Sequence, residues 1–498
     1  MTLPSRSWIN KSFLVLPALG VVALGAAGLA LWLSGAIVQP VNIGQEDEPV
    51  AVRPVATTSQ TAAALPAGTL TLGSGQPAAQ LAPSPDPAAQ LAPSPELAGA
   101  WPWFRGPSRD NISTEPTPLL RDLGAAKRLW TVSLGEGYAA PAVLDGCAYI
   151  LDYDQVNSAD ALRCLSLADG AEVWRYSYPL KVKRNHGMSR TVPAVTDQYV
   201  VALGPKCHVT CLDAKTGRFV WGMDLVGQFG TIVPEWYAGQ CPLIDGERVI
   251  LAPGGSALAI AVELASGKIL WQCPNPNRWN MSHASLAVME LGGRKMYVYA
   301  AAANPAAKTG GGLAGIDAQT GEILWESTAW QIPEAVIASP LPLPDGRIFL
   351  GGGYGAGCLM LQVKLEGDKF TTAPLWRLNE KQFGAVQQTP IFYQDHIYGV
   401  RPDGQMTCLD LAGNILWTSG QAKFGLGPFM IADGHLLAMD DSGLLTLAEF
   451  SPTTFKVISQ SKILDGHDSW GPFALTGGLL LARDLTSMVC LDLRRIAN

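Results

Sequence analysis

The sequence predicts an all-β fold, an eight-bladed β-propeller whose blades are four-stranded antiparallel sheets. One observation is a repeated phrase: CLDAKTGRFVW at residues 211–221 returns as GIDAQTGEILW at residues 315–325. A second is a small residue followed by proline and an apolar run, which recurs at spacings of 38 to 54 residues. The third is composition, with 53 glycines, 36 prolines and only 15 % charged residues. A repeat of this length with several short strands is typical of propeller blades.

Each repeat contains four expected strands. The first follows the proline, a DG-type turn leads to the second, and a looser loop leads to the third. A tight turn then leads to the fourth strand, which ends at tryptophan. In the D-x-x-T-G form of this turn, aspartate caps the turn and glycine takes the positive φ at which the hairpin reverses. The eight first strands begin after Pro141, Pro193, Pro242, Leu286, Pro340, Pro390, Pro428 and Pro472.

The tryptophans that end the fourth strands are expected to hold neighbouring blades together. One blade cannot cover its own apolar faces, so the repeats must stack. An indole buries a large flat surface where one sheet packs on the next. These docking residues are Trp130, Trp174, Trp221, Trp271, Trp325, Trp376 and Trp417, of which we expect Trp174, Trp221, Trp271, Trp325 and Trp417 to be largely buried.

The two ends of the repeat region are expected to close the ring. The last copy, residues 467–498, has three strands and then stops at CLDLRRIAN without a fourth. An unpaired fourth strand, KRLWTVSL around Trp130, stands before the first complete copy. Because sheet edges are open to unwanted pairing, this N-terminal strand is predicted to complete the last blade and remove the free edges.

The N-terminal region predicts a membrane anchor. Residues 13–38 carry no charge, and about 20 apolar residues suffice to span a bilayer. Arg6 and Lys11 precede this stretch, whereas Glu46, Asp47 and Glu48 follow it. The positive-inside rule then makes residues 1–12 cytoplasmic, residues 13–38 a single-pass transmembrane helix, and places the remainder across the membrane. A cleaved signal peptide is the alternative, although its apolar core is usually shorter, about 7–15 residues.

Residues 39–99 are predicted to be a disordered, proline- and alanine-rich linker, followed by the propeller domain at residues 100–498. The ten residues PAAQLAPSPD at 77–86 return as PAAQLAPSPE at 87–96. Proline at this density prevents regular helix, and alanine with serine supplies no core. The segment is therefore expected to act as a spacer between membrane and propeller.

Charge and cysteine content narrow the possible functions. The net charge of −7 argues against nucleic-acid binding, which usually requires a basic face. Four of the nine cysteines precede leucine at equivalent repeat positions and are expected to be small buried residues. Cys147 and Cys164 could face each other across a hairpin; the sequence leaves a disulfide between them open and favours free thiols.

No catalytic or metal-binding motif is found. The glycine run GGGYGAG at residues 351–357 is not followed by a helix, so we interpret it as a turn between strands and not as a nucleotide-binding loop. The six histidines are scattered, and no G-x-S-x-G motif occurs. Acidic residues lie mostly in the repeated turns, which predicts no metal site.

The candidate binding site is the mouth of the central channel, where the residues before each first strand should converge. Loops are ordinarily small and polar, but these positions carry aromatic and hydrogen-bonding side chains. They are Tyr138, His186, Arg190, Trp236, Tyr237, His283, Gln387, Gln388 and Trp470. Two interpretations stay open: the rings fill the channel, or they line a pocket for a peptide or small polar ligand. The adjacent basic stretch KVKRNHGMSR at residues 181–190 is either a solvated loop or a site for an acidic partner.

The D-x-x-T-G-x-x-x-W pattern resembles the tryptophan-docking motif of PQQ-like, or quinoprotein-like, eight-bladed propellers. The resemblance covers about residues 101–498, and the opening WPWFRGPSRDNISTEP is similar to the leader of membrane-anchored bacterial PQQ-like repeat proteins. The family contains quinoprotein alcohol and glucose dehydrogenases and also BamB, a non-catalytic propeller of outer-membrane assembly. The motif is specific for the fold and says little about function.

The resemblance implies two functions. The dehydrogenases typically have two adjacent cysteines over the cofactor and often C-x-x-C-H for haem; this sequence has neither, and its nearest pair is CHVTC at residues 207–211. We therefore expect no enzyme and no cofactor, but a BamB-like, monomeric binding or scaffolding propeller. It would sit on the periplasmic side of a bacterial inner membrane and bind a cell-envelope protein or peptide. The alternative is an oxidoreductase that uses PQQ with calcium.

Overall fold

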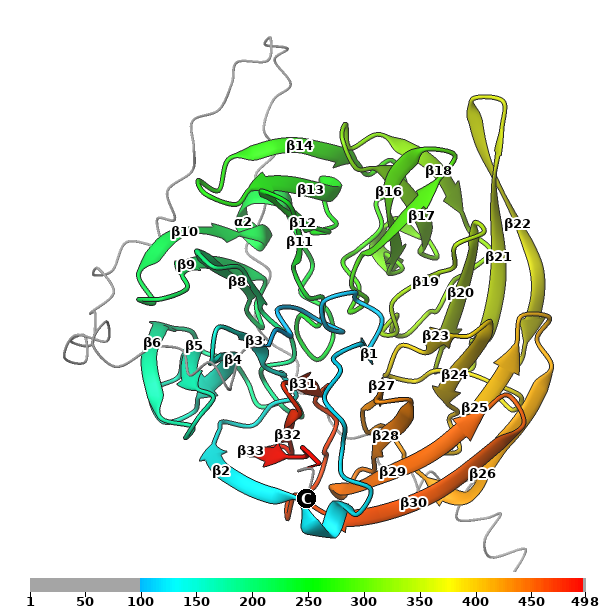
Figure 1. Ribbon diagram of the computed structural model, residues 1–498. Helices are drawn as coiled ribbons and strands as arrows, with labels where there is room; N and C mark the ends of the chain where they lie inside the picture. Colours follow the sequence, from blue (N-terminus) through cyan, green and yellow to red (C-terminus); the bar gives the residue numbers. More distant parts are fainter. Residues whose placement is uncertain (1–98, 496–498) are drawn as a thin grey trace, which may run out of the picture. The chain divides into compact units, whose positions relative to one another are not determined.

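The eight blades form a closed ring around a central channel (Figure 1). The computed structural model describes residues 99–495. Within that range seven sheets have four strands and one has five, and neighbours within the repeated units are antiparallel. The predicted all-β, eight-bladed fold is confirmed. The expected anchor at residues 13–38 and nearly all of the expected linker lie outside the described residues.

The blades are numbered along the chain, and the strands of each blade are given from the innermost to the outermost. Blade one consists of β3 (Ala142–Leu144), β4 (Cys147–Asp154), β5 (Ala159–Ser166) and β6 (Glu172–Pro179), and blade two of β7 (Ala194–Val195), β8 (Tyr199–Leu203), β9 (His208–Asp213) and β10 (Phe219–Asp224). Blade three consists of β11 (Leu243–Asp245), β12 (Arg248–Leu251), β13 (Ala257–Glu263) and β14 (Ile269–Pro274), and blade four of β15 (Ala287–Leu291), β16 (Arg294–Ala301), β17 (Gly312–Asp317) and β18 (Ile323–Ser327).

The second half of the ring repeats this order. Blade five consists of β19 (Leu341–Pro342), β20 (Arg347–Gly352), β21 (Gly357–Glu366) and β22 (Lys369–Leu378), and blade six of β23 (Ile391–Tyr393), β24 (His396–Val400), β25 (Gln405–Asp410) and β26 (Ile415–Lys423). Blade seven consists of β27 (Phe429–Ala432), β28 (His435–Met439), β29 (Leu444–Ser451) and β30 (Thr454–Lys462), with β1 (Ile112–Ser113) added at its inner edge. Blade eight consists of β31 (Ala474–Thr476), β32 (Leu479–Arg483), β33 (Ser487–Asp492) and β2 (Lys127–Ser133). Short helices are η4 (Leu123–Ala125), α2 (Leu225–Phe229) and η5 (Pro305–Ala307).

The core lies between the blades. The middle strands are apolar on both faces, as in β13, where residues 257–262 are all buried. The outermost strand β14 instead has exposed residues between covered ones. One apolar cluster joins Val201 and Leu203 of the second blade to Val249 and Leu251 of the third. Each blade therefore buries its faces only by stacking on its neighbours, as a repeat of this kind requires.

Most of the docking tryptophans contact the turn between the two outer strands of the next blade; the indole N–H of Trp325 instead donates to Met296 of its own blade. The indole Nε1 of Trp221 donates to the carbonyl of Leu264 at 2.8 Å, and Trp174 donates to Ala214 at 3.0 Å. Gly217 lies against the Trp174 ring with φ +68°, and a Cβ there would lie 2.6 Å from Cδ2 of the indole. The glycine of the repeated turn is thus required twice, for its backbone conformation and for the close approach of the ring.

The docking tryptophans are not equally covered. Trp130, Trp174, Trp221 and Trp325 are buried, whereas Trp271, Trp376 and Trp417 are half-buried, although Trp271 and Trp417 were expected to be buried. Trp417 docks on residues 451–454, which replace the glycine turn by the end of the longer hairpin β29–β30. Trp271 is half-buried although it lies against Gly321 of an unchanged glycine turn, so the turn alone does not set how far an indole is covered.

The ring closes as the sequence predicted. Strand β2 pairs antiparallel with β33, with Trp130 opposite Cys490. The indole of Trp130 then docks on the first blade through a 2.8 Å hydrogen bond to the carbonyl of Leu167. The last blade therefore contains strands from both ends of the described chain, which leaves no gap in the ring.

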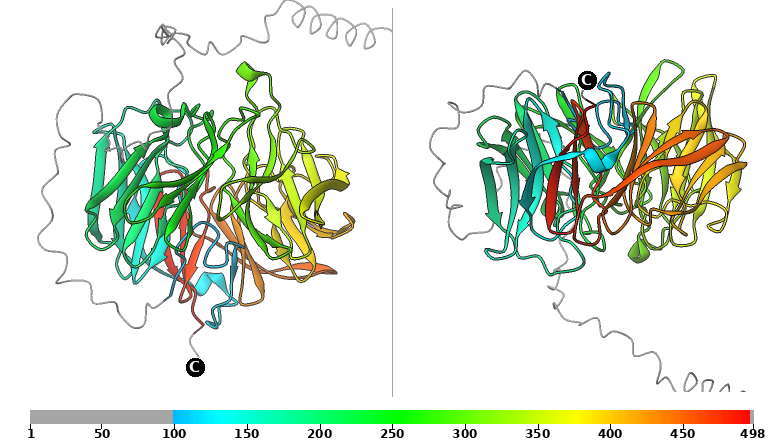
Figure 2. Two further views of the ribbon diagram at one scale, coloured as in Figure 1. Left: turned by 90° about the horizontal axis from the view of Figure 1, so that it is seen from above. Right: turned by 60° about the horizontal axis from the view of Figure 1, so that its bottom comes forward.

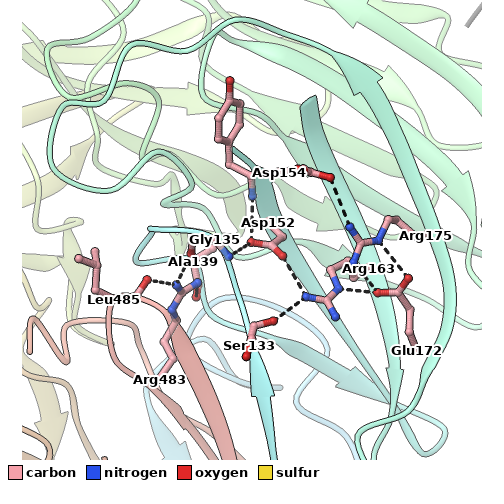
Figure 3. Close-up of polar contacts among 11 residues, drawn as sticks. Ser133, Gly135, Ala139, Asp152, Asp154, Arg163, Glu172, Arg175, Arg483 and Leu485 are labelled. Carbon is pink, nitrogen blue, oxygen red and sulfur yellow. Dashed lines mark hydrogen bonds and ion pairs between the residues drawn. The ribbon is translucent and has the colours of Figure 1, made fainter. Parts of the chain in front are cut away.

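Arg483 holds this closure from inside (Figure 3). Its side chain is 1 % exposed, and its guanidinium donates to the carbonyls of Gly135 (3.1 Å), Ala139 (3.2 Å) and Leu485 (2.7 Å). Gly135 and Ala139 belong to the segment that leads from β2 into the first blade. One buried cation thus joins the last blade to the first, and burial lowers its pKa to about 10.

A second cluster lies beside it, between β2 and the first blade (Figure 3). The Asp152 carboxylate accepts from the backbone N–H of Gly135 at 2.6 Å and pairs with Arg163 at 3.0 Å. Arg163 also donates to the carbonyl of Ser133 and pairs with Glu172 at 2.6 Å. Burial would raise the pKa of Glu172, but hydrogen bonds and charges from its arginine neighbours lower it below the usual value.

Residues 101–121 cross the centre of the ring at one face, an arrangement that the sequence did not predict (Figures 1 and 2). Trp101 bridges to Val143 of the first blade. Arg105 donates to the carbonyl of Thr389 in front of the sixth blade at 2.8 Å. Ile112 and Ser113 form β1, which pairs in parallel with β27. In the seventh blade this pairing covers the inner edge of the innermost strand.

All nine cysteines lie in the described part of the chain, and all are buried and unpaired, including Cys147 and Cys164. They therefore act as small apolar residues of the interblade core. Between residues 99 and 495 the structure contains no helix long and apolar enough to cross a membrane.

Candidate functional site

The two faces of the ring carry different parts of the chain. We call the side with the loops before each innermost strand the loop face, and the side with the turns after each innermost strand the turn face. Glu115 accepts a hydrogen bond from Gly477, in the turn after β31, at 2.6 Å. Gly99, the first described residue, lies against this same turn. The described chain therefore begins at the turn face.

A belt of small side chains lies where the innermost strands begin. The backbone N–H of Val192 donates to the Cys241 thiol at 3.2 Å, and that of Cys241 donates to the Ser285 hydroxyl at 2.9 Å. The backbone N–H of Ser285 donates in turn to the Ser339 hydroxyl at 3.0 Å, and the backbone N–H of Ser339 donates to the Thr389 hydroxyl at 2.9 Å. The small residue that precedes the innermost strand of blades three to six thus accepts a hydrogen bond from a backbone N–H of the preceding blade.

Above this belt, the channel mouth holds a cavity of about 270 Å³. The structure brings eight of the nine predicted residues to its wall: Tyr138, His186, Arg190, Trp236, His283, Gln387, Gln388 and Trp470. Tyr237 does not line the cavity, since its hydroxyl donates to the carbonyl of Lys183 outside it. The rings therefore do not fill the channel completely.

Aromatic rings form two opposing parts of the cavity wall. Tyr138 and Trp470 are stacked with centroids 5.0 Å apart. Trp236 is stacked with His283 at 6.2 Å and with Tyr354 at 6.1 Å. Stacked rings are a favoured arrangement of aromatic groups, and these side chains make the wall of the cavity largely aromatic.

Hydrogen bonds hold one of these pairs in place. The indole N–H of Trp470 donates to the Asp441 carboxylate at 2.7 Å, and the Tyr138 hydroxyl donates to Asp468 at 3.3 Å. The amide of Gln388 donates to the carbonyl of Trp470 at 2.9 Å. Burial together with the charge of Asp468 raises the pKa of Tyr138 to about 12, so this hydroxyl remains a donor at neutral pH.

Arg190 is the cation of the cavity. Its guanidinium lies 4.9 Å from the centroid of the Tyr138 ring, a cation–π contact. Its Nε donates to the carbonyl of Trp236, and its Nη2 to that of Asn185 at 3.3 Å. Burial lowers its pKa to about 10. Burial and the nearby charge of Arg190 also lower the pKa of His283 to about 4, so His283 is neutral at physiological pH.

Several residues around this cavity have a strained backbone. His186, Trp236 and Tyr354 have φ values of +55°, +61° and +54°, and Tyr237, next to Trp236, has +74°. This left-handed conformation is unfavourable for bulky residues, and such strain typically persists at binding and catalytic sites. These backbone conformations lower the local stability of the loops and place the side chains of His186, Trp236 and Tyr354 at the wall of the cavity.

Two aromatic lining residues were missed by the sequence analysis. Tyr354 belongs to the glycine run at residues 351–357, which is a turn as expected but brings an aromatic ring to the wall. Phe104 belongs to the segment that crosses the turn face and reaches the cavity from below. An aromatic residue inside a glycine-rich turn was the available signal for Tyr354. No local signal pointed to Phe104.

The chemistry of the lining residues does not fit a calcium-dependent quinone cofactor. No Asp or Glu is among the residues that line the cavity, whereas calcium sites rely on clustered oxygen ligands and usually include carboxylates. Across residues 99–495 no group of three or more His, Cys, Asp or Glu residues could hold a metal ion. Cys241 is the one cysteine of the lining, so adjacent thiols are absent there. The cavity offers aromatic surfaces, amides, hydroxyls and one cation.

Comparison with known proteins adds a family match. The family model described as outer membrane protein assembly factor BamB matches residues 158–419 and 313–470, which together span more than half of the chain. No protein with a curated function matches the sequence.

Solved propellers with different roles share the fold. BamB from Moraxella catarrhalis superposes with a TM-score of 0.51 and 13 % identity, over 75 % of this chain and 99 % of that protein. A europium-containing methanol dehydrogenase gives 0.57 and 12 %, over 78 % and 90 %. Quinohemoprotein alcohol dehydrogenase ADHIIG from Pseudomonas putida HK5 gives 0.56 and 12 %, over 80 % and 81 %. At such identities these similarities concern the fold alone. Because the family model covers most of the ring, the chain belongs to the PQQ-like propeller family represented by the BamB model.

Proposed function

We propose that this chain is a membrane-tethered binding or scaffolding propeller, similar in kind to BamB, that presents its loop face to a cell-envelope protein, peptide or small polar ligand. The proposed placement is the periplasmic side of a bacterial inner membrane, with residues 13–38 as the anchor. The observation that carries the proposal is the strained, aromatic cavity at the channel mouth. It opens on the face opposite to the one at which the described chain begins.

The alternative is a quinone-dependent oxidoreductase, which the similarity to dehydrogenase propellers keeps in view. The lining of the cavity argues against it, because it has no carboxylate for calcium or for general base catalysis and no adjacent cysteines. The mouth instead has the composition expected of a binding pocket, apolar walls with a few polar groups.

Site-specific photo-crosslinking in intact cells tests the proposal. A photoreactive residue replaces His186, which is exposed at the rim of the cavity, and the matched control replaces Glu247, exposed on the turn face. We expect a reproducible adduct with an envelope protein or peptide from position 186 and none from position 247. Identical adducts from both positions, or none from either, would count against a binding role of the loop face.

A second measurement separates the two classes. Purified protein is supplied with PQQ and calcium, and dye-linked oxidation of alcohols and sugars is followed. We expect no saturable turnover. Turnover that saturates with PQQ would replace the binding role by the oxidoreductase.

A further inference from the structure

Arg190 differs from the buried arginines of the ring, because it is half-buried and lines the cavity. Arg163 is paired with two carboxylates, and every guanidinium nitrogen of Arg105 and Arg483 donates to a carbonyl. Arg190 uses only Nε and Nη2, both on carbonyls. Within residues 99–495 its Nη1 has no partner, and no carboxylate forms an ion pair with Arg190.

Partial burial of a guanidinium removes part of the hydration of its charge, and without a counterion this loss is not recovered. The unpaired Nη1 of Arg190 is not among the buried atoms, so a ligand in the cavity can reach it. Besides the two carbonyls, the fold supplies the cation–π contact with the Tyr138 ring as a favourable interaction with the charge. An anionic group that enters the cavity would supply the counterion and the hydrogen-bond acceptor that Arg190 lacks.

The charge of the site indicates a monoanion. Arg190 is the single arginine or lysine that lines the cavity, and His283 beside it is neutral at physiological pH. A carboxylate carries one charge, and its two coplanar oxygens match the planar donors of a guanidinium. A phosphate dianion would need a second cation, which the lining does not provide.

The remaining wall indicates the body of the ligand. Trp470 stacked on Tyr138, and Trp236 stacked on Tyr354, line the cavity with aromatic side chains. Rings of this kind favour an aromatic or extended apolar group. The volume of about 270 Å³ is at the lower end of ligand pockets, about 300–1,000 Å³, and suits a group the size of one large amino acid.

We propose that the cavity binds a carboxylate that carries an aromatic or apolar body, with Arg190 as the anchor of the carboxylate. Two sources share this chemistry, a free aromatic acid and the C-terminal residue of a peptide or protein. The inference rests on the proposed binding role of the loop face and specifies what that face recognises.

Titration calorimetry on the purified full-length chain in detergent tests it with matched probes. N-acetyl-L-phenylalanine has the carboxylate, and N-acetyl-L-phenylalanine amide has the same body without the charge. We expect the acid to bind at least about tenfold more tightly than the amide, because only the acid pairs with Arg190. Equal affinity for acid and amide, or no binding of the acid, would overturn the inference.

Three variants locate the effect. Arg190→Gln should weaken binding of the acid by about tenfold or more and leave the amide unchanged. Arg184→Gln is the matched control on the same loop; Arg184 is 70 % exposed, pairs with Glu136 and does not line the cavity, so affinity should stay as in the parent. Arg190→Lys keeps the charge but lacks the planar guanidinium, so this variant should retain part of the affinity for the acid. Retained affinity in Arg190→Lys would show that the loss in Arg190→Gln comes from the missing charge and not from a folding defect. Equal loss in the Arg190 and Arg184 variants would contradict the anchor.

A third probe distinguishes the two sources. N-acetyl-Ala-Ala-Phe with a free carboxylate binds more tightly than N-acetyl-L-phenylalanine if a protein C-terminus is the natural ligand, and more weakly if a free acid is. Either order supports the carboxylate anchor. The outcomes also separate the inference from the proposed function: if acid and amide bind equally while position 186 still crosslinks a partner, the binding role stands and the carboxylate inference fails.

Discussion

At the scale of single residues, Asp160 is a buried carboxyl group that does not line the candidate binding cavity. Asp160 on β5 is 4 % exposed; one of its oxygens accepts from the Tyr178 hydroxyl at 2.7 Å, and the other has no partner among the described residues. Burial raises its pKa to about 7, although the Tyr178 hydrogen bond opposes this shift. Asp160 therefore favours its protonated form in the folded state.

This environment predicts a specific dependence of stability on pH. An acid whose pKa is higher in the folded than in the unfolded state contributes most below the unfolded value of about 3.9, and its contribution declines as pH rises to about 7. Asp160→Asn cannot ionise, so its advantage over the parent should grow between pH 4 and pH 7, by on the order of 4 kcal/mol at most. Urea unfolding at several pH values measures this. Parallel stability curves for the two proteins would show that Asp160 ionises normally.

At the scale of elements, the repeated turn and the tryptophan act as one unit. The tryptophan belongs to one blade and the glycine beneath it to the next, as for Trp174 over Gly217. The motif is read along one chain, but the contact that explains it joins two successive copies. This is why the motif predicts the stacking of blades as well as their strands.

Coverage of the indole should set the cost of losing it. Trp221 is 6 % exposed and docks on the turn at Leu264, so Trp221→Ala should lower the free energy of unfolding by about 3–5 kcal/mol. Trp417 has the same role but is half-buried, and Trp417→Ala should cost clearly less. Chemical denaturation of both variants measures the difference. A loss below about 1 kcal/mol for Trp221→Ala would refute the docking role.

At the scale of the whole molecule, stability depends on how the ring is closed. Strand β2 completes the last blade, and Arg483 joins that blade to the segment leading into the first. Residues 101–121 add contacts across the turn face, from the first blade to the seventh. Contacts between sequence positions more than 300 residues apart therefore hold the ends together.

Replacement of Arg483 tests this closure. Arg483→Met fills similar space but leaves buried carbonyls without a donor, so we expect the free energy of unfolding to fall by about 3 kcal/mol or more. The matched control is Arg347→Met, whose ion pair with Asp345 lies on an exposed turn and should be worth about 0–1 kcal/mol. Denaturant melts of both variants give the comparison. Similar small losses in the two proteins would mean that Arg483 does not secure the ring.

The sequence by itself determined the repeat, the number of blades, the closure by the strand around Trp130 and the register that brings the loop residues to the channel mouth. These properties follow from local patterns, because a strand, a turn and a glycine conformation depend on neighbouring residues. Eight of the nine candidate residues meet at one cavity because equivalent positions of a closed repeat converge on its axis.

Only the tertiary structure decided how segments without a repeat are used. Residues 101–121 carry no period, so their path across the turn face and the position of Phe104 beneath the cavity could not be predicted. The same holds for Tyr237, which bonds outside the cavity, and for the missing partner of Arg190. Such features depend on contacts between distant parts of the chain, and their energies are set by shape and burial, which no local pattern of residues encodes.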